Sequence, residues 1–337
     1  MIDIIYKKED WNKVLLEIGK YDFYHTYDYH VALAKKGEIP ILIVYWEQEK
    51  KIAFPFIKKN VYGKYSDITS VHGYLGPIQC NVDSDFDNAG FKSSFENLLI
   101  SENIITAFSK LNPFIKGQDE VLNALGNIEA IGELVYFDQQ MDDETQKSFY
   151  SRNTRRSLKK LRQTATVVER KTPKDIDDFI KIYHQTMDRL GAHKKFYYGN
   201  EYFDRLVNSN LFNCKILFAI DDETKETIAA AFATHSCEIC HLELICTNED
   251  FSKYGPSRIV YDEARAILKN EQIKYLVLGG GSGGREGSLM KFKSSFTQNY
   301  IDYRIWKYIA IPDIYESIQT DFQKSVDSDF FPRYRIV

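Results

Sequence analysis

The sequence contains the same order of predicted elements twice, and this repeat constrains the fold more than any other feature. The apolar segment PILIVYW at residue 40 corresponds to KILFAI at residue 215, and the apolar run from Ile104 corresponds to the one from Lys274. The offset of about 170 to 175 residues is half of the chain. Sequence identity between the halves is negligible, so the repeat rests on element order alone. Such an order predicts two similar α/β domains.

Hydrophobic periodicity places the elements in each half. The first half is predicted to contain strands at 2–6, 40–46, 52–59, 72–79 and 104–111 and helices at 10–18 and 91–101. The second half is predicted to contain strands at 165–171, 215–220, 227–235, 241–247 and 273–279 and helices that begin at 173 and 257. We place the domain boundary after the strand-like ELVYFD, giving domains of residues 1–141 and 142–337 with a cleft between them.

Composition and charge limit the function classes. The chain is 44% hydrophobic with a net charge of −4, which favours packed domains and disfavours a surface that wraps nucleic acid, so we expect no stable DNA complex. The first residues do not form a signal peptide, and no apolar run approaches the ~20 residues that span a bilayer. We expect a cytoplasmic protein without a transmembrane segment, with peripheral attachment at the inner face of the membrane left open.

The cysteines include a C-x-x-C-H spacing, which is also the spacing of haem attachment. Cys237, Cys240 and His241 form it, and Cys246 lies nearby. The surrounding sequence reads as two strands joined at a turn, where residues three apart point to opposite faces. No second ligand pair stands at zinc-ribbon spacing. We therefore predict strand cysteines and no metal site.

A glycine-rich segment, LGGGSGG, follows the last predicted strand of the repeat. Gly279, Gly281 and Gly284 satisfy G-x-G-x-x-G, the spacing of a dinucleotide-binding turn. That turn belongs near the start of a domain and needs a second parallel strand after its helix, whereas these glycines close a domain. We predict that they let the backbone approach a substrate or a neighbouring element closely.

A basic segment, residues 152–162, lies between the halves. It carries six cations and no acid: Arg152, Arg155, Arg156, Lys159, Lys160 and Arg162. A solvated helix face is one interpretation. Like charges at i,i+4 repel each other, however, and phosphates would relieve that repulsion. A phosphate-bearing ligand is the other interpretation.

Six segments occur in the order seen in FemAB-like proteins: HGYLGPI, ITAFSKLNP, SRNTRRSLKKL, IYHQTMDRLGA, KYGPSRIVYDEA and LGGGSGGREGSLMKFKSSF. These proteins are tandem acyl-CoA N-acyltransferase-like (GNAT) proteins related to the peptidoglycan interpeptide-bridge aminoacyltransferases. The resemblance covers roughly residues 10–310. Among these proteins, the chain is similar to the subgroup found with bacterial surface-polysaccharide genes. It implies an α/β fold of two tandem GNAT-like domains, each a mixed, mostly antiparallel sheet flanked by helices.

The resemblance also implies an N-acyl- or aminoacyltransferase. The acceptor would be an amine on a phosphate-bearing sugar nucleotide or on a lipid-linked precursor of the cell envelope or of a polysaccharide. A Phe-Lys pair in such enzymes places a lysine beside the reacting carbonyl, and Phe292-Lys293 matches it. A cation there stabilises the oxyanion that forms as the amine attacks. Lys293 is therefore the first catalytic candidate, with a solvated lysine as the alternative.

Further candidates follow from residue chemistry. Glu286 is predicted to accept the amine proton. Predicted substrate-binding residues are Arg152, Arg156, Lys159, Arg285, Lys291, His72, Tyr74 and Tyr198. Structural interpretations are a solvated helix face for the cations of the basic segment, a cap on the loop for Arg285, and core packing for Tyr74 and Tyr198.

Two departures from the family pattern leave the donor open. Gly287 stands where related sequences have an acid, and the coenzyme A loop is degenerate in residues 252–257. Gly255 and Ser257 remain cofactor-binding candidates, because they open a helix whose N–H groups can hold a phosphate. The donor is expected to be acyl-CoA or an aminoacyl-tRNA, the latter making tRNA a partner. A non-catalytic binding protein that keeps the fold is the alternative function, and an RNA-binding module is a third.

Overall fold

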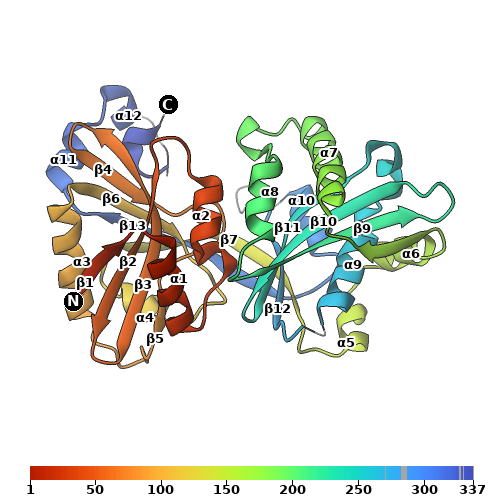
Figure 1. The fold of residues 1–337 in the computed structure, drawn as a ribbon, viewed down its shortest axis with the longest axis horizontal. Helices are drawn as coiled ribbons and strands as arrows, with labels where there is room; N and C mark the ends of the chain where they lie inside the picture. The colour runs from red at the N-terminus through yellow and green to blue at the C-terminus, as the bar shows by residue number, and fades with distance from the viewer. Residues whose placement is uncertain (270, 282–286, 326–327, 329, 337) are drawn as a thin grey trace. The chain divides into compact units, whose positions relative to one another are not determined.

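The computed structural model describes residues 1–269, 271–281, 287–325, 328 and 330–336. The chain forms two compact units (Figure 1). Unit 1 consists of Met1–Ile131 and Asp302–Val337, and unit 2 consists of Gly132–Ile301. In each unit a mostly antiparallel sheet is flanked by helices, which confirms the predicted fold class.

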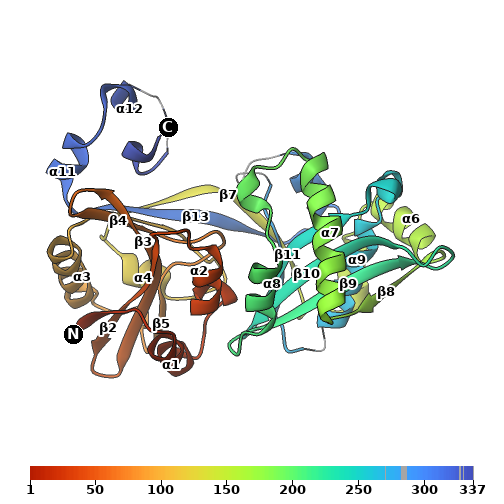
Figure 2. The ribbon, with the colours of Figure 1, turned by 45° about the horizontal axis from the view of Figure 1, so that its top comes forward.

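Unit 1 begins with a strand and two helices and continues as a sheet. Its strands are β1 (Ile2–Ile5), β2 (Ile39–Glu47), β3 (Lys50–Tyr62), β4 (Tyr65–Thr69), β5 (Ile78–Cys80), β6 (Ile104–Lys110) and most of β13 (Tyr300–Ile309). Its helices are α1 (Lys8–Ile18), α2 (Tyr27–Leu33), α3 (Ala89–Ser101), α4 (Gln118–Leu122), α11 (Pro312–Ser317) and α12 (Asp321–Ser325). The two last helices follow β13 (Figure 2).

Unit 2 repeats this order. Its strands are most of β7 (Asn127–Asp138), β8 (Ala165–Glu169), β9 (Asn213–Asp221), β10 (Thr227–Ser236), β11 (Ile239–Thr247) and β12 (Tyr275–Gly279). Its helices are α5 (Asp143–Ser148), α6 (Arg152–Leu161), α7 (Pro173–Arg189), α8 (Asn200–Val207), α9 (Ser257–Leu268) and α10 (Ser288–Lys293). Pro173 occupies the first turn of α7, where its missing N–H is not needed, and Thr172 caps the helix.

The predicted repeat is confirmed by the strand order. Within unit 1 the order is β1-β2-β3-β4-β6-β13, and within unit 2 it is β8-β9-β10-β11-β12-β7. The fourth and fifth strands of each order are parallel, β4 with β6 and β11 with β12. The other pairs within each unit are antiparallel. The two halves of the chain therefore have one topology.

The compact units differ from the predicted domains, because each half of the chain donates its last strand to the other half's sheet. β7, from the first half, pairs with β12 through residues such as Phe137 and Leu276. β13, from the second half, pairs with β6 through residues such as Trp306 and Ser109. The units therefore divide the chain at 131/132 and 301/302, not after residue 141.

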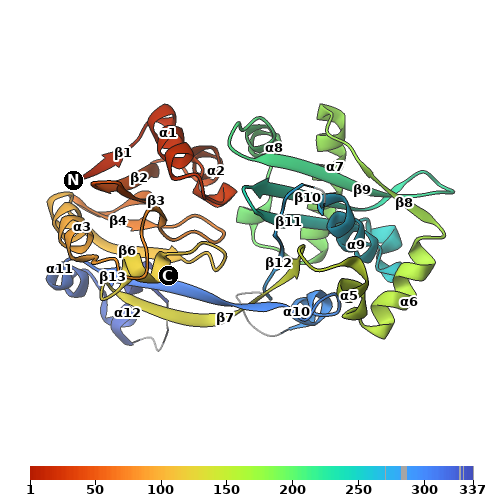
Figure 3. The same cartoon turned by 90° about the horizontal axis from the view of Figure 1, so that it is seen from below.

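Helices cover both faces of the unit 2 sheet, as seen from below in Figure 3. On one face α6 and α9 pack through Leu158 and Ala264 on strand residues such as Ala231. On the other face Phe179 of α7 and Phe203 of α8 meet Phe232, with ring centroids 5.9 and 5.2 Å apart. This packing places β11 between helices on both faces of the sheet, with α9 on one of them; β11 and α9 carry the candidate site.

Candidate active site in unit 2

A β-bulge interrupts β11 at Glu243. Phe232 of β10 pairs with Leu244 and the next residue, Ala233, pairs with Leu242, so Glu243 is the extra residue. The pairing of β11 with β12 covers Ile239–His241 and Tyr275–Val277, whereas β11 itself continues to Thr247. Bulges often re-aim a side chain beside an active site. Glu243 is half-buried in an otherwise apolar stretch of strand.

Lys293, the predicted catalytic residue, lies at the end of α10 and is only 9% exposed. Its Nζ atom donates a hydrogen bond to the main-chain oxygen of Gly280 at 2.8 Å. Desolvation lowers the pKa of Lys293 to about 8, and the carboxylate of Glu243 opposes that shift. Lys293 is therefore not a solvated surface lysine, and Glu243 lies near enough to act on its charge.

The glycine segment after β12 supplies the partner of Lys293. Gly279 ends the strand with φ +79°, in the left-handed region that favours glycine, and Gly280 then presents its carbonyl to the lysine. The predicted close approach of backbone is thus seen at Gly280. Two predicted site residues, Arg285 and Glu286, lie outside the described residues, and their roles stay predictions.

Three tyrosines form a stack beside Glu243. The ring of Tyr198 lies 4.1 Å from that of Tyr202 and 6.2 Å from that of Tyr183, both nearly parallel to it. Burial raises the pKa of each phenol, and the carboxylate of Glu243 raises it further. The hydroxyl of Tyr202 is buried without a hydrogen-bond partner among the described residues. Phenols that stay neutral thus lie close enough to Glu243 to feel its charge, and a neutral phenol can pass on a proton.

The basic segment forms α6 and presents its cations to solvent. Thr154, Leu158 and Leu161 are buried, whereas all six cations are exposed. Among the described residues, only Arg162 of the six forms an ion pair, with Asp262 and Glu263. The start of α6 contacts the chain just after α10: Thr154 Oγ1 donates to Ser295 Oγ at 2.8 Å. Ser295 follows Lys293 by two residues in the chain, so the start of α6 is bonded to the segment just after Lys293. Lys291, on α10, is exposed.

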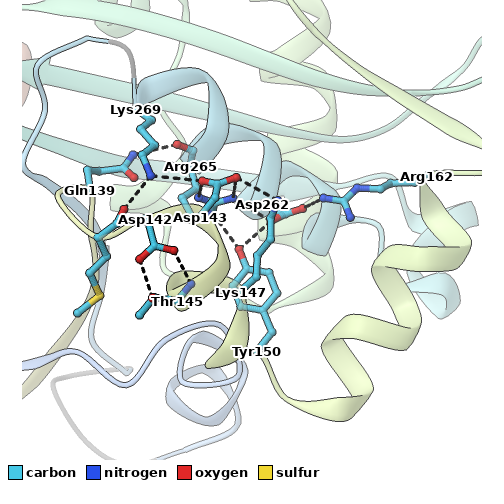
Figure 4. A network of polar contacts seen from close by, with 11 residues as sticks. Gln139, Asp142, Asp143, Thr145, Lys147, Tyr150, Arg162, Asp262, Arg265 and Lys269 are labelled. Carbon is cyan, nitrogen blue, oxygen red and sulfur yellow. Dashed lines mark hydrogen bonds and ion pairs between the residues drawn. The ribbon is translucent and has the colours of Figure 1, made fainter.

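A buried polar network anchors α5 and α6 to α9 (Figure 4). The hydroxyl of Tyr150 donates to Asp262 at 2.7 Å and accepts from Nε of Arg265 at 3.1 Å. Arg265, 1% exposed, also donates to Asp143 at 2.7 Å, and Arg162 reaches Asp262 from α6. Beside the network lies a cavity of about 410 Å³ lined by Lys147, Tyr150, Arg155, Leu158, Lys159, Arg162 and Asp262. Four cations around one cavity suit an anionic ligand.

The predicted coenzyme A loop precedes α9. Gly255 has φ +62°, and Ser257 is the first residue of the helix. Pro256 lies between them and has no N–H, so this loop offers one donor fewer to a phosphate than a loop without proline. The geometry is compatible with the predicted cofactor-binding role of Gly255 and Ser257, which stays a prediction.

The predicted site residues of unit 1 lie apart from these in the chain. His72 is exposed, and Tyr74 is half-buried. The ring of Tyr74 packs edge-on against Tyr24 and Tyr303, with centroids 5.8 and 5.3 Å apart. This packing is the core role considered for Tyr74, and substrate binding by His72 and Tyr74 stays a prediction.

The cysteines follow the strand interpretation with one difference. Cys240 and Cys246 are buried on β11, whereas Cys237 lies in the exposed turn between β10 and β11. Burial raises the pKa of the Cys246 thiol. Within the described part of the chain, no group of three metal-ligating side chains is close enough to hold an ion, and no helix there has the length and apolarity to cross a bilayer.

Comparisons with known proteins concern a domain and the fold. Residues 148–293 match the family model "Acetyltransferase (GNAT) domain". Among solved structures, FemX superimposes with a TM-score of 0.72 and 10% identity over 94% of this chain and 100% of its own. The C-terminal domain of a putative lysylphosphatidylglycerol synthetase from Agrobacterium fabrum superimposes with a TM-score of 0.57 and 12% identity over 92% of this chain and 96% of its own. A tandem GNAT protein from the clavulanic acid biosynthesis pathway superimposes with a TM-score of 0.51 and 8% identity over 92% of this chain and 99% of its own. No curated protein sequence matches the chain.

Residues 148–293 thus match a GNAT acetyltransferase domain, and the fold of the chain is that of a tandem GNAT structure. Both units have the same strand order, and 94% of the chain superimposes on FemX, so the chain has the fold of that protein. At these identities the structural likenesses establish the fold, and the substrates have to be argued from the site.

Sequence reasoning missed Glu243 and Tyr202. Glu243 carried one available signal, an acid inside the apolar run HLELIC. A single strand, however, does not reveal a bulge, because a bulge is defined by the register of the neighbouring strand. Tyr202 lies on a short helix that the sequence analysis did not predict.

Proposed function

We propose that the protein transfers an acyl or aminoacyl group onto a primary amine of a phosphate-bearing acceptor, with the reaction centred on Lys293 and Glu243 of unit 2. The observation that carries this proposal is the buried ammonium of Lys293, held by the Gly280 carbonyl beside the bulged Glu243. A desolvated cation next to a carboxylate suits a step in which a proton leaves an amine and negative charge develops on a carbonyl oxygen.

Lys293 stabilises that developing charge. An ammonium has three N–H donors, and Gly280 takes one of them. A second can donate to the carbonyl oxygen of the donor as the tetrahedral intermediate forms. Because the lysine is buried, this interaction is stronger than it would be in water.

Glu243 removes the proton of the acceptor. The acceptor ammonium gives a proton to the carboxylate, directly or through one water, and its nitrogen attacks the acyl carbon. The intermediate then collapses, the amide bond remains, and the bond to the carrier breaks. The nitrogen is positively charged in the intermediate and loses its second proton, which the leaving thiolate or alkoxide takes, directly or relayed by the phenol of Tyr198 or Tyr202, so each phenol ends neutral. Glu286 remains the second candidate base.

The basic segment supports an acceptor that carries phosphate. Five of its six cations have no ion pair among the described residues, and Arg155, Lys159 and Arg162 line the cavity beside Tyr150. A phosphate would neutralise cations that otherwise repel one another along α6. A sugar nucleotide or a lipid-linked precursor of the cell envelope or a polysaccharide has this chemistry. The proposed place of the reaction is the cytoplasm, including the inner face of the membrane, and the proposed donors are acyl-CoA and aminoacyl-tRNA.

The proposal is tested by incubating the purified protein with acetyl-CoA or aminoacyl-tRNA and a panel of amino-sugar nucleotides, followed by mass spectrometry of the acceptors. The expected result is an acceptor that gains the mass of the acyl group. Glu243→Gln should lower turnover by about a hundredfold or more, the usual contribution of a positioned base. Glu226→Gln, at an exposed turn of the same unit, is the matched control.

A binding protein that has lost the chemistry predicts a different outcome. It would retain a phosphate-bearing ligand in the same panel without any acyl gain, and Glu243→Gln would leave that binding unchanged. An RNA-binding module would instead retain RNA and ignore the sugar nucleotides.

A further inference from the structure

A cavity of about 640 Å³ lies in unit 1, and neither the fold nor the proposed reaction accounts for it. Its lining comes from β1, from α1 and from the β2–β3 hairpin, and it includes Trp46 and six charged side chains. The volume is that of a small-ligand site, typically about 300 to 1,000 Å³. Every lining residue belongs to unit 1, so the cavity shares no residue with the candidate site of unit 2.

Trp46 is turned toward this cavity by the alternation of side chains along β2. Its neighbour Tyr45 packs against Phe91 of α3, so Trp46 points to the opposite face of the sheet. Lys51, opposite Trp46 on β3, forms an ion pair with Glu17, which places α1 on that face.

The indole of Trp46 is not used by the fold. Trp46 is half-buried, and among the described residues its ring has no aromatic or cation–π contact and its N–H has no hydrogen-bond partner. An indole offers a large apolar face and one polar donor. Both are therefore available to a ligand in the cavity.

The charged side chains of the cavity balance one another. They are three acids and three lysines, namely Asp3, Asp10, Glu17, Lys7, Lys13 and Lys51. Among the described residues, Asp10, Lys7 and Lys13 form neither an ion pair nor a side-chain hydrogen bond. The cavity on α6, in contrast, is lined by four cations and one acid. An anion or a cation would meet like charges in the balanced lining, so it suits an uncharged ligand that both donates and accepts hydrogen bonds.

We propose that this cavity binds an uncharged saccharide, with one sugar ring stacked on Trp46. The C–H groups on one face of a pyranose carry partial positive charge and meet the negative face of the indole. The hydroxyls at the edge of the ring donate to the carboxylate of Asp10 and accept from the ammonium groups of Lys7 and Lys13. The site is additional to the proposed acyl transfer and does not depend on it.

A peptide is the other class of ligand that this part of unit 1 allows. β1 lies at the edge of the unit 1 sheet, where an extended peptide could add a strand. Such a peptide would lie about 5 Å beyond β1 and about 10 Å from β2, the strand that carries Trp46. It would leave the indole unused, so Trp46 favours the saccharide.

Tryptophan fluorescence tests the inference directly, because the other two tryptophans, Trp11 and Trp306, are fully buried. Acrylamide should therefore quench Trp46 selectively. The probes are two uncharged oligosaccharides, triacetylchitotriose and maltotriose. At least one of them should protect Trp46 from acrylamide and saturate with a Kd of about 1 mM or below. In calorimetry, Trp46→Ala should weaken that binding by about tenfold or more.

Controls separate this result from a loss of structure. Tyr62→Ala removes an exposed aromatic ring of the same unit that does not line the cavity, and it should bind the saccharide as the wild type does. Asp10→Ala should weaken binding by about threefold to tenfold, because it removes an acceptor for the hydroxyls. Glu9→Ala, at the neighbouring exposed acid outside the lining, should leave binding unchanged. Thermal melting reports folding, and Trp46→Leu replaces the Ala variant if that variant does not fold.

Several results would overturn the inference. One is the absence of protection by both saccharides, and another is equal saccharide affinity in the wild type and Trp46→Ala. Protection of Trp46 by blocked pentaalanine alone would assign the cavity to a peptide instead. UDP should leave the quenching of Trp46 unchanged, and protection by UDP would contradict an uncharged ligand.

Discussion

The Nζ atom of Lys293 lies 2.8 Å from the main-chain oxygen of Gly280, so the end of α10 is tied to the glycine segment that follows β12. Gly280 therefore acts through its backbone, as a partner for a buried cation. The same contact orients the ammonium and leaves it two further donors.

Replacing Lys293 by Met should lower turnover by about a hundredfold or more, the usual effect of removing one oxyanion donor. Affinity for the acceptor should change much less, because the interaction strengthens only as charge develops on the carbonyl. The measurement is kcat and KM for the substrate pair found in the acceptor panel. Lys181→Met, on the exposed face of α7, is the control and should keep wild-type kinetics.

An equal loss of binding and turnover in Lys293→Met would point to a different role, that of a phosphate clamp. Unchanged turnover with a genuine substrate would remove Lys293 from the reaction altogether.

Stability should depend on pH through Lys293. Its pKa is lowered to about 8 in the folded protein from an ordinary 10.5. Between these values the unfolded chain binds more protons than the folded chain, so the free energy of unfolding rises with pH. From pH 7 to pH 10 the free energy of unfolding of the wild type should rise by about 2 to 3 kcal/mol relative to that of Lys293→Met, which lacks the titrating group. Urea unfolding of both proteins at the two pH values measures this difference.

A constant difference between the two proteins across that pH range would mean that the ammonium is not desolvated. The electrostatic argument for its role would then lose its basis.

Much of the fold was predictable because its signals are local. Periodicity placed α1, α7 and α9 and the strand pairs β2–β3 and β9–β10, and the repeated order revealed two similar sheets. The exchange of β7 and β13 was not predictable in this way. An apolar alternation shows that a segment is a strand, but the choice of partner strand depends on contacts distant in sequence. The predicted strand at 72–79 was wrong in part, since it overlaps β5 (Ile78–Cys80) only at Ile78 and Gln79.

The site was predictable to a smaller extent. The Phe-Lys pair indicated Lys293, and its burial agrees with a functional position. Arg258 and Phe292 stack although they are far apart in the sequence, and Glu243 is displaced by a register shift relative to β10. Neither relationship leaves a pattern in a single segment. Residue type suggests chemistry, but the fold decides which side chains meet.

Arg265 should be a main support of unit 2. It is 1% exposed and donates to Tyr150 and Asp143, beside the buried carboxylate of Asp262. Arg265→Met should lower the free energy of unfolding by about 3 kcal/mol, because it leaves buried polar groups without a partner. Urea unfolding measures this loss, with the exposed Arg170→Met as the control. A loss below about 1 kcal/mol would mean that the network stabilises the fold no more than an ordinary surface ion pair does.

The basic segment should bind its ligand mainly through charge. Replacing Arg152 and Arg156 together by Ala should weaken binding of the phosphate-bearing acceptor and flatten its dependence on salt, since each removed cation eliminates one screened contact. Both side chains are exposed and lack ion pairs among the described residues, so the fold should be little affected. The measurement is acceptor affinity by calorimetry at several salt concentrations.

Replacing Lys181 and Arg189 of α7 by Ala removes two exposed cations from the same unit and should leave both affinity and salt slope unchanged. If the two double variants bind alike at low salt, the basic segment is a solvated helix face and the acceptor's phosphate binds elsewhere.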